Sequence, residues 1–219
     1  MKNASNKERC AALKLMNDMY SIPKWVFCTH NQHKIKEAQE IVADKISLMS
    51  LSEVDFFEEV EETGNTFKEN AFLKANAVWE ATGLPCVADD SGLCVAALNH
   101  APGIYSSRYA GIPVNHQANI DKVLANLSGV PNREAYFITV LCIIGVLEQP
   151  IYVEGKIFGS ITDAVAGFGG FGYDSIFKPK GYDLTFAEMN ADAKNEISHR
   201  ALAFKALLDL YLSVKIQVN

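Results

Sequence analysis

The sequence predicts an α/β protein with a mixed central sheet flanked by helices, arranged as two lobes with the active-site cleft between them. Strand patterns and helix patterns alternate as far as residue 129. Two long β-rich runs follow at 134–147 and 150–162, joined by a short turn. Alternation favours parallel strands, whereas adjacent β-rich runs favour an antiparallel hairpin, so the sheet should be mixed.

The length and composition suit a single globular domain. The chain has 219 residues, 49% of them hydrophobic, which is enough for a sizeable core. We assign this domain to residues 24–219 and treat the mostly polar residues 1–23 as an N-terminal extension of unknown role. An organelle-targeting segment is the other interpretation of that extension.

Charge and hydropathy narrow the choice of partners. The net charge is -6 and no long basic run occurs, so we expect no nucleic-acid partner, although a few local cations could still bind a small anion. No apolar run approaches the roughly 18 residues of a spanning helix, and no secretory signal is visible. We therefore expect no membrane partner and a cytoplasmic location. Four of the five cysteines are interpreted as small core residues in a reducing compartment, namely Cys28, Cys86, Cys94 and Cys142.

The first two predicted elements offer an anion site. Residues 24–28 are predicted to form a buried strand and residues 32–43 a helix. Thr29 and Asn31 lie between them, and Lys34 follows in the first helical turn. A strand that enters a helix in this way presents free backbone N–H groups, the positive end of the helix dipole and an ammonium group to an anion.

The next predicted helix spans residues 66–83. Thr66 and Glu69 form a capping box at its start. Asn70 and Lys74 are four residues apart on this helix, so their side chains share one face.

Residues 84–98 are predicted to form a strand, a turn and a second strand. Asp89 and Asp90 end the first apolar run, and Ser91 and Gly92 supply the turn. Side chains alternate across a strand, so the two aspartates should point to different sides unless the turn has already begun.

The remaining elements follow in order. An irregular loop at 101–111 precedes an amphipathic helix at 115–129. After the hairpin at 134–162, a glycine-rich loop with embedded aromatic residues occupies 167–181. A last helix begins near Ser198.

Two pairs of acidic residues are candidates for binding a divalent metal ion. Glu61 and Glu62 lie in a loop that is free to approach Asp89 and Asp90. Converging carboxylates and cations suit Mg²⁺ with a polyphosphate, because Mg²⁺ takes one or two protein carboxylates and completes its shell with waters and phosphate oxygens. A plain turn at Asp-Ser-Gly, without a metal, is the alternative.

Cations and aromatic residues from separate segments complete the candidate set. The aromatic residues of the glycine-rich loop, Phe168, Phe171 and Tyr173, would either stack on a flat ring or pack on the core. The cations would either bind phosphate or remain solvated, and they are Lys34, Lys74, Lys178, Lys194 and Arg200.

Six motifs, in order along residues 25 to 208, resemble those of the inosine triphosphate pyrophosphatase family. The matching stretches are THNQHK, EETGNTFKENAFLKA, ADDSGL, APGIYSSRYAG, GFGYDSIF and DAKNEISHR. The resemblance implies hydrolysis of non-standard purine nucleoside triphosphates (ITP, dITP, XTP) to the monophosphate and pyrophosphate, with Mg²⁺ as cofactor. It also implies a homodimer, for which the loop at Arg108 and Tyr109 is a candidate interface.

The resemblance further implies a role for each matched residue. The catalytic residues would be Asp90, as general base, with Lys74 and Asp89, and Asp90 and Glu62 would hold the metal. The triphosphate, sugar and base would contact a larger set, consisting of Thr29, Asn31, Lys34, Ser91, Phe171, Gly172, Tyr173, Asp174, Lys194, His199 and Arg200.

One position departs from the family pattern. His30 stands where the family's first motif has glycine, and a histidine forced to positive φ there would be strained by about 1 kcal/mol or more. A nucleotide-binding sensor without hydrolysis is therefore one alternative function. A phosphatase with an aspartyl nucleophile is another, although it normally needs two aspartates with one residue between them.

Overall fold

The computed structural model describes residues 22–217 of the chain. The proposed N-terminal extension therefore lies outside the described residues except for its last two positions. None of the helices in this part of the chain has the length and apolar character needed to cross a membrane.

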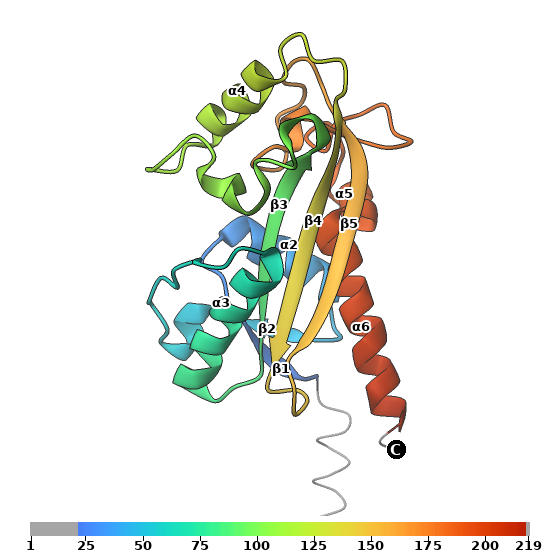
Figure 1. The fold of residues 1–219 in the computed structure, drawn as a ribbon. Coiled ribbons are helices and arrows are strands. Elements are labelled where there is room, and N and C mark those ends of the chain that lie inside the picture. The colour runs from blue at the N-terminus through green and yellow to red at the C-terminus, as the bar shows by residue number, and fades with distance from the viewer. Residues whose placement is uncertain (1–21, 218–219) are drawn as a thin grey trace, which may run out of the picture.

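A six-stranded sheet forms the centre of the fold (Figure 1). Its order is β2-β1-β3-β4-β5-β6, with β1 parallel to both β2 and β3 and every later pairing antiparallel. The prediction of a mixed sheet is confirmed, whereas the division into two lobes stays a prediction. The strands are β1 (Lys24–Phe27), β2 (Ser47–Met49), β3 (Cys86–Val95), β4 (Glu134–Ile144), β5 (Ile151–Ile161) and β6 (Phe177–Pro179).

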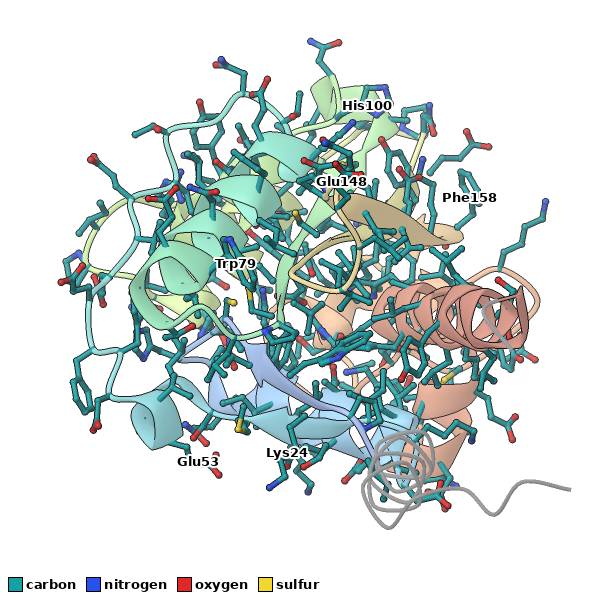
Figure 2. All side chains as sticks on the ribbon, turned by 90° about the horizontal axis from the view of Figure 1, so that it is seen from below. Lys24, Glu53, Trp79, His100, Glu148 and Phe158 are labelled. Carbon is teal, nitrogen blue, oxygen red and sulfur yellow. The ribbon has the colours of Figure 1, made fainter. Side chains whose placement is uncertain are left out.

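Helices cover both faces of the sheet. Seen from below, α3 and α6 lie on opposite sides of the strands, with Trp79 labelled on α3 and Phe158 on β5 (Figure 2). The α-helices are α2 (Gln32–Val42), α3 (Phe67–Thr82), α4 (His116–Asn126), α5 (Ala191–Ile197) and α6 (His199–Gln217). The 3-10 helices are η1 (Leu51–Val54), η2 (Ala96–Leu98), η3 (Gly103–Arg108) and η4 (Asp174–Ile176).

The core follows the alternation of side chains along β3. Val87 belongs to the cluster that α2 and α6 form with one sheet face, whereas Cys86 and Ala88 belong to the cluster under α3. Leu93 and Val95 continue the first face into a third cluster, which α4 covers. Residues with odd numbers on β3 therefore face α2, α6 and α4, and residues with even numbers face α3.

The predicted turn inside the DDSG motif is wrong. Strand β3 runs unbroken through it, and Ser91 and Gly92 pair with Thr139 and Ile138 of β4. Gly92 is needed for a different reason: a Cβ there would lie 2.3 Å from the carbonyl oxygen of Gly103. The glycine permits close approach of η3 to the sheet, and the acids before it lie within a paired strand.

Other predictions from the sequence hold. Gly83 ends α3 in the left-handed conformation, with φ of 65°. β4 and β5 form the predicted hairpin, and the last helix begins at His199. The four cysteines interpreted as core residues are buried free thiols, whereas Cys10 lies outside the described residues.

Candidate active site

A cavity of about 340 Å³ opens beside the middle of β3. It is lined by residues from the end of β1, the acidic loop before α3, β3 itself, η3, the glycine-rich loop and the start of α6. The predicted site residues that line it are Thr29, Asn31, Lys34, Glu62, Lys74, Asp90, Ser91, Phe171, Gly172, Tyr173, Asp174, Lys194, His199 and Arg200. Asp89 lies directly behind this wall and is fully buried.

Asp90 faces α3 and meets the two residues that the sequence predicts to share a helix face. Asn70 Nδ2 donates to Asp90 Oδ2 at 3.2 Å, and Lys74 Nζ lies 3.4 Å from Asp90 Oδ1. Lys74 Nζ also donates to Glu62 Oε1 and to the backbone oxygen of Asp89, each at 2.7 Å. The acid pair of β3 and the acidic loop therefore converge on one ammonium group.

Burial sets the protonation behaviour of this group. It raises the pKa of Asp90 above its ordinary value, against the lowering effect of Lys74. Burial also opposes the charges of Glu62 and Lys74, but the attraction of Lys74 prevails at Glu62 and lowers its pKa, and the attraction of Asp90 and then Glu62 prevails at Lys74 and raises its pKa. Asp90 is thus the carboxylate in this group with the greatest tendency to accept a proton.

Asp89 faces the opposite side of the sheet and joins two cations. Lys34 Nζ lies 2.5 Å from Asp89 Oδ1, and Arg200 Nε lies 2.9 Å from Asp89 Oδ2. Ser91 Oγ donates to the same Oδ2 at 3.0 Å. Burial opposes its charge, yet Lys34 and Arg200 hold the pKa of Asp89 well below its ordinary value. Both carboxylate oxygens accept hydrogen bonds, so Asp89 joins the first turn of α2 to the start of α6.

The far end of the cavity is a buried ion-pair chain. Lys194 Nζ lies 2.7 Å from Asp174 Oδ2 and 2.7 Å from Glu37 Oε1. Arg200 donates through Nη1 to Glu37 Oε2. Burial disfavours the charge of Lys194, but Asp174 and Glu37 outweigh it and raise its pKa. Two cations are therefore held in place at this end before any ligand arrives.

His199 lies in an apolar layer next to these cations. Its ring stacks on Phe137, with centroids 4.6 Å apart and planes inclined by 9°. Burial and then the nearby Arg200 lower the pKa of His199 well below 6.5, so the ring is neutral at pH 7. Its Nδ1 atom is buried and has no hydrogen-bond partner within residues 22–217.

The loop at residues 29–31, which the sequence predicts to bind phosphate and which is called the phosphate loop below, is held in place by its own side chains. Asn31 is the N-cap of α2, and its Oδ1 accepts from the backbone N–H groups of His33 and Lys34. Thr29 Oγ1 accepts from the backbone N–H of Asn31. The condition for strain at His30 is not met: this residue is not among the described residues with positive φ, and its Nε2 lies 3.3 Å from the carbonyl oxygen of Glu58.

The glycine-rich loop presents one aromatic side chain to the cavity and packs another. Tyr173 is buried, and its hydroxyl donates to the carbonyl oxygen of Ser106 at 2.8 Å. Phe171 is half-buried and lines the cavity near Lys194 and Arg200. Phe168 is fully exposed and lines no part of the cavity, so of the three aromatic residues only Phe171 presents a ring that is both accessible and close to the cations.

The carboxylates suit a metal that is bound together with phosphate. Within residues 22–217, no three His, Cys, Asp or Glu side chains cluster as a metal site. Glu62 and Asp90 nevertheless reach the same ammonium group, so one cation can contact both. Mg²⁺ commonly uses one or two protein carboxylates and completes its shell with waters and substrate oxygens. The two carboxylates fit that requirement.

Two residues of the site were missed by reasoning from sequence. Glu37 lies three residues after Lys34, on the same face of a predicted helix, and that spacing was the available signal. Arg108 was considered only as an interface candidate, but its Nη1 lies 3.2 Å from Glu62 Oε2 in the same chain. Lys178, a predicted candidate, lies on β6 away from this cavity and lines a second one.

Comparisons with known proteins point to one family. A model of the Ham1 family matches residues 25–210. A dITP/XTP pyrophosphatase of Porphyromonas gingivalis is 47% identical over 193 residues, which span 88% of this chain and 99% of that relative. A dITP/XTP pyrophosphatase of Bacillus subtilis is 46% identical over 188 residues, with shares of 84% and 95%. The solved structure of the Staphylococcus aureus Ham1 protein has a TM-score of 0.79 at 39% identity, covering 87% of this chain and 98% of that one.

Proposed function

Because the chain belongs to the Ham1 family, we propose that it hydrolyses non-standard purine nucleoside triphosphates (ITP, dITP and XTP) to the monophosphate and pyrophosphate. The names of relatives that are 43% to 47% identical over most of the chain support this activity. The observation that carries it is Asp90: a buried carboxylate with a raised pKa, beside Lys74 and Asn70, on the wall of the cavity.

Asp90 is the general base of the proposed reaction. Its carboxylate removes a proton from a water molecule, whose oxygen attacks the α-phosphorus while the bond to the bridging oxygen of pyrophosphate breaks. Asn70 fixes one carboxylate oxygen and Lys74 the other, so the base is oriented before the substrate binds. Lys74 and Lys34 stabilise the negative charge that develops on the phosphate oxygens.

Mg²⁺ is the proposed cofactor, and Glu62 and Asp90 are the residues that would hold it. When bound, it neutralises phosphate charge and polarises the phosphoryl group. Arg108 and Lys74 keep Glu62 ionised and turned toward Asp90. This arrangement keeps two carboxylates available to one divalent ion.

Selectivity for the base comes from the fixed polar groups at the far end of the cavity. Hypoxanthine and xanthine present a carbonyl at the purine 6-position, which accepts a hydrogen bond from Arg200 or Lys194. Adenine presents an amino group there, so donors would face a donor. A site of buried hydrogen-bonding groups can reject such a mismatch by roughly 10⁴-fold.

The remaining expectations complete the proposal. Residues 24–219 act as one domain in the cytoplasm, and the protein forms a homodimer, as the family resemblance implies. Light scattering coupled to size-exclusion chromatography measures the mass directly. A single-chain mass of 24.1 kDa at micromolar concentration would contradict the dimer.

A substrate panel with product identification tests the activity. We expect ITP, dITP and XTP to release pyrophosphate in the presence of Mg²⁺, and ATP to react far more slowly. Release of orthophosphate would instead indicate a phosphatase, and tight binding of ITP without turnover would indicate a sensor.

The variant Asp90→Asn tests the assignment of the base. Loss of a general base typically costs about 10²- to 10⁴-fold in rate, and we expect a fall in kcat within this range. Asp121→Asn is the matched control, because Asp121 is exposed on α4 and its carboxylate accepts a hydrogen bond from Gln117, four residues earlier on the same helix. Turnover of Asp90→Asn within threefold of the wild type, with the fold intact, would rule out Asp90 as the base.

A further inference from the structure

The ring of Phe171 is stacked on a residue outside the cavity. His33, in the first turn of α2, lies parallel to it, with ring centroids 5.1 Å apart and planes inclined by 18°. Phe171 lines the cavity together with Lys194 and Arg200, whereas His33 is not among the described residues that line it. His33 therefore contacts the ring from a position that does not line the cavity.

The residues on both sides of Phe171 are glycines. Gly170 and Gly172 flank it, both with positive φ, at 68° and 59°. Glycine adopts such angles freely and also leaves them easily, so a ring between two of them has a large conformational entropy to lose on ordering. Three hydrogen bonds hold the backbone of this segment: the N–H of Phe171 donates to Asp174 Oδ2 at 2.8 Å, the N–H of Asp174 donates to the carbonyl oxygen of Phe171 at 3.3 Å, and the N–H of Gly169 donates to the carbonyl oxygen of Ala187 at 2.9 Å.

Helix α2 stabilises the position of Phe171 at two points. His33 and Glu37 are four residues apart and share a face of this helix. Glu37 binds Lys194, which binds Asp174, which holds the backbone of Phe171. His33 holds the ring of Phe171 directly. The helix whose N-terminus forms the phosphate loop thus braces both the backbone and the ring of Phe171.

We propose that His33 is a positioning residue for the purine base: its imidazole braces Phe171 and so holds the phenyl ring at the cavity wall, beside Lys194 and Arg200, as a platform for the base. This inference rests on the proposed function, because the ligand is taken to be a purine nucleotide. A platform held in place before binding removes an entropic cost from binding. His33 then acts on the affinity for the base and leaves the phosphate chemistry unchanged.

A role in phosphate binding is the competing explanation, because His33 lies two residues from Asn31 at the positive end of α2. The two roles differ in what they recognise. Bracing requires a flat ring at position 33, whereas phosphate binding requires a nitrogen that donates a hydrogen bond. His33→Phe keeps the first property and removes the second, and His33→Ala removes both.

Three measurements on the full chain separate these roles. Calorimetry gives the dissociation constants of IMP and of tripolyphosphate, the second being a ligand without a base. Steady-state kinetics gives KM and kcat for ITP, and hydrogen exchange reports the mobility of the amides at 167–173. Lys36→Ala, an exposed neighbour on the same helix, is the matched control.

We expect His33→Ala to weaken IMP binding and to raise KM for ITP by about 2- to 12-fold, the range that corresponds to one stacked aromatic pair. Its kcat and its affinity for tripolyphosphate should change by less than twofold, and exchange at 167–173 should accelerate. His33→Phe should restore the affinity for IMP, the KM for ITP and the exchange rate at 167–173, and Lys36→Ala should change none of these.

Two results would overturn the proposal. One is an equal loss of tripolyphosphate and IMP affinity in His33→Ala that His33→Phe fails to restore, which would assign His33 to the phosphates. The other is unchanged exchange at 167–173 with unchanged IMP affinity. If the wild type binds no inosine nucleotide, the proposed function fails instead, while the exchange data still decide whether His33 braces the loop.

Discussion

The ion-pair chain at the far end of the cavity makes Glu37→Gln the most informative single change. Glu37 is the only carboxylate in the described part of the chain that forms ion pairs with both Lys194 and Arg200, whose side chains are 7% and 2% exposed. The variant keeps the shape of the side chain. It replaces two acceptor oxygens by one oxygen and one NH₂ group, so a donor must face one of the two cations.

The expected cost follows from burial. Breaking a buried ion pair by removing one partner costs about 3 to 5 kcal/mol, because a buried charge is left uncompensated. The Glu37 side chain is only 14% exposed, so solvent screens the pair little. The amide oxygen still accepts one hydrogen bond, which places the estimate at the lower end, about 3 kcal/mol in the free energy of unfolding.

Urea unfolding at pH 7.5 measures this difference, with the unfolding slope checked for constancy. Glu40→Gln is the control, because Glu40 lies on the same helix and its two contacts, with Asn195 and Lys36, are exposed. The kcat/KM for ITP should fall in Glu37→Gln, whereas inhibition by tripolyphosphate should hold. A loss of stability no greater than that of Glu40→Gln, within about 0.5 kcal/mol, would refute the reasoning.

Three further changes test the site. The pKa of His199 in the folded protein is well below the 6.5 of the unfolded chain, so the unfolded state binds the extra proton and stability is lost as pH falls through 6.5. Relative to His199→Phe, the wild type should lose about 1.4 kcal/mol of unfolding free energy between pH 7.5 and 5.5 in urea titrations. An equal pH dependence of stability in the two proteins would contradict this. Gly155→Ala should destabilise by about 1 to 3 kcal/mol in the same assay, because its Cβ would lie 2.0 Å from the carbonyl oxygen of His199; unchanged stability would show that α6 can move aside. Lys74→Met should lower kcat for ITP by about 10²-fold or more, since the carboxylates of Glu62 and Asp90 lose their shared cation, and a rate within fivefold of the wild type would contradict its role.

The long periodic elements were predictable because their signals are local. Asn31, Thr66 and Gly83 mark helix ends by hydrogen bonds or backbone angles that involve only near neighbours. The turn predicted within β3 is wrong because that prediction also used only local signals. Ser91 and Gly92 are residues typical of turns, but the ten residue pairs between β3 and β4 keep them in a strand. Strands β2 and β6 have three residues each and depend on pairing with neighbouring strands, so the sequence contains no local pattern that predicts them.

The site was predictable where motifs mark it and unpredictable where tertiary contacts create it. Spacing alone placed Asn70 and Lys74 on one face, and both contact Asp90. One of the two cationic partners of Asp89 is Arg200, 111 residues away, which no spacing rule relates to it. Glu37 was missed because its importance comes entirely from two cations that the fold brings to it.

The linkage of Asp89 to Arg200 and Glu37 has a consequence for attempts to redesign the enzyme. Arg200 touches the carboxylate that also anchors Lys34, so a substitution of Arg200 made to accept a new base would also disturb Lys34, the residue proposed to bind the triphosphate. Retuning base preference here would require compensating changes on β3 and α2 in the same step. Variants obtained one at a time should therefore trade base preference against turnover.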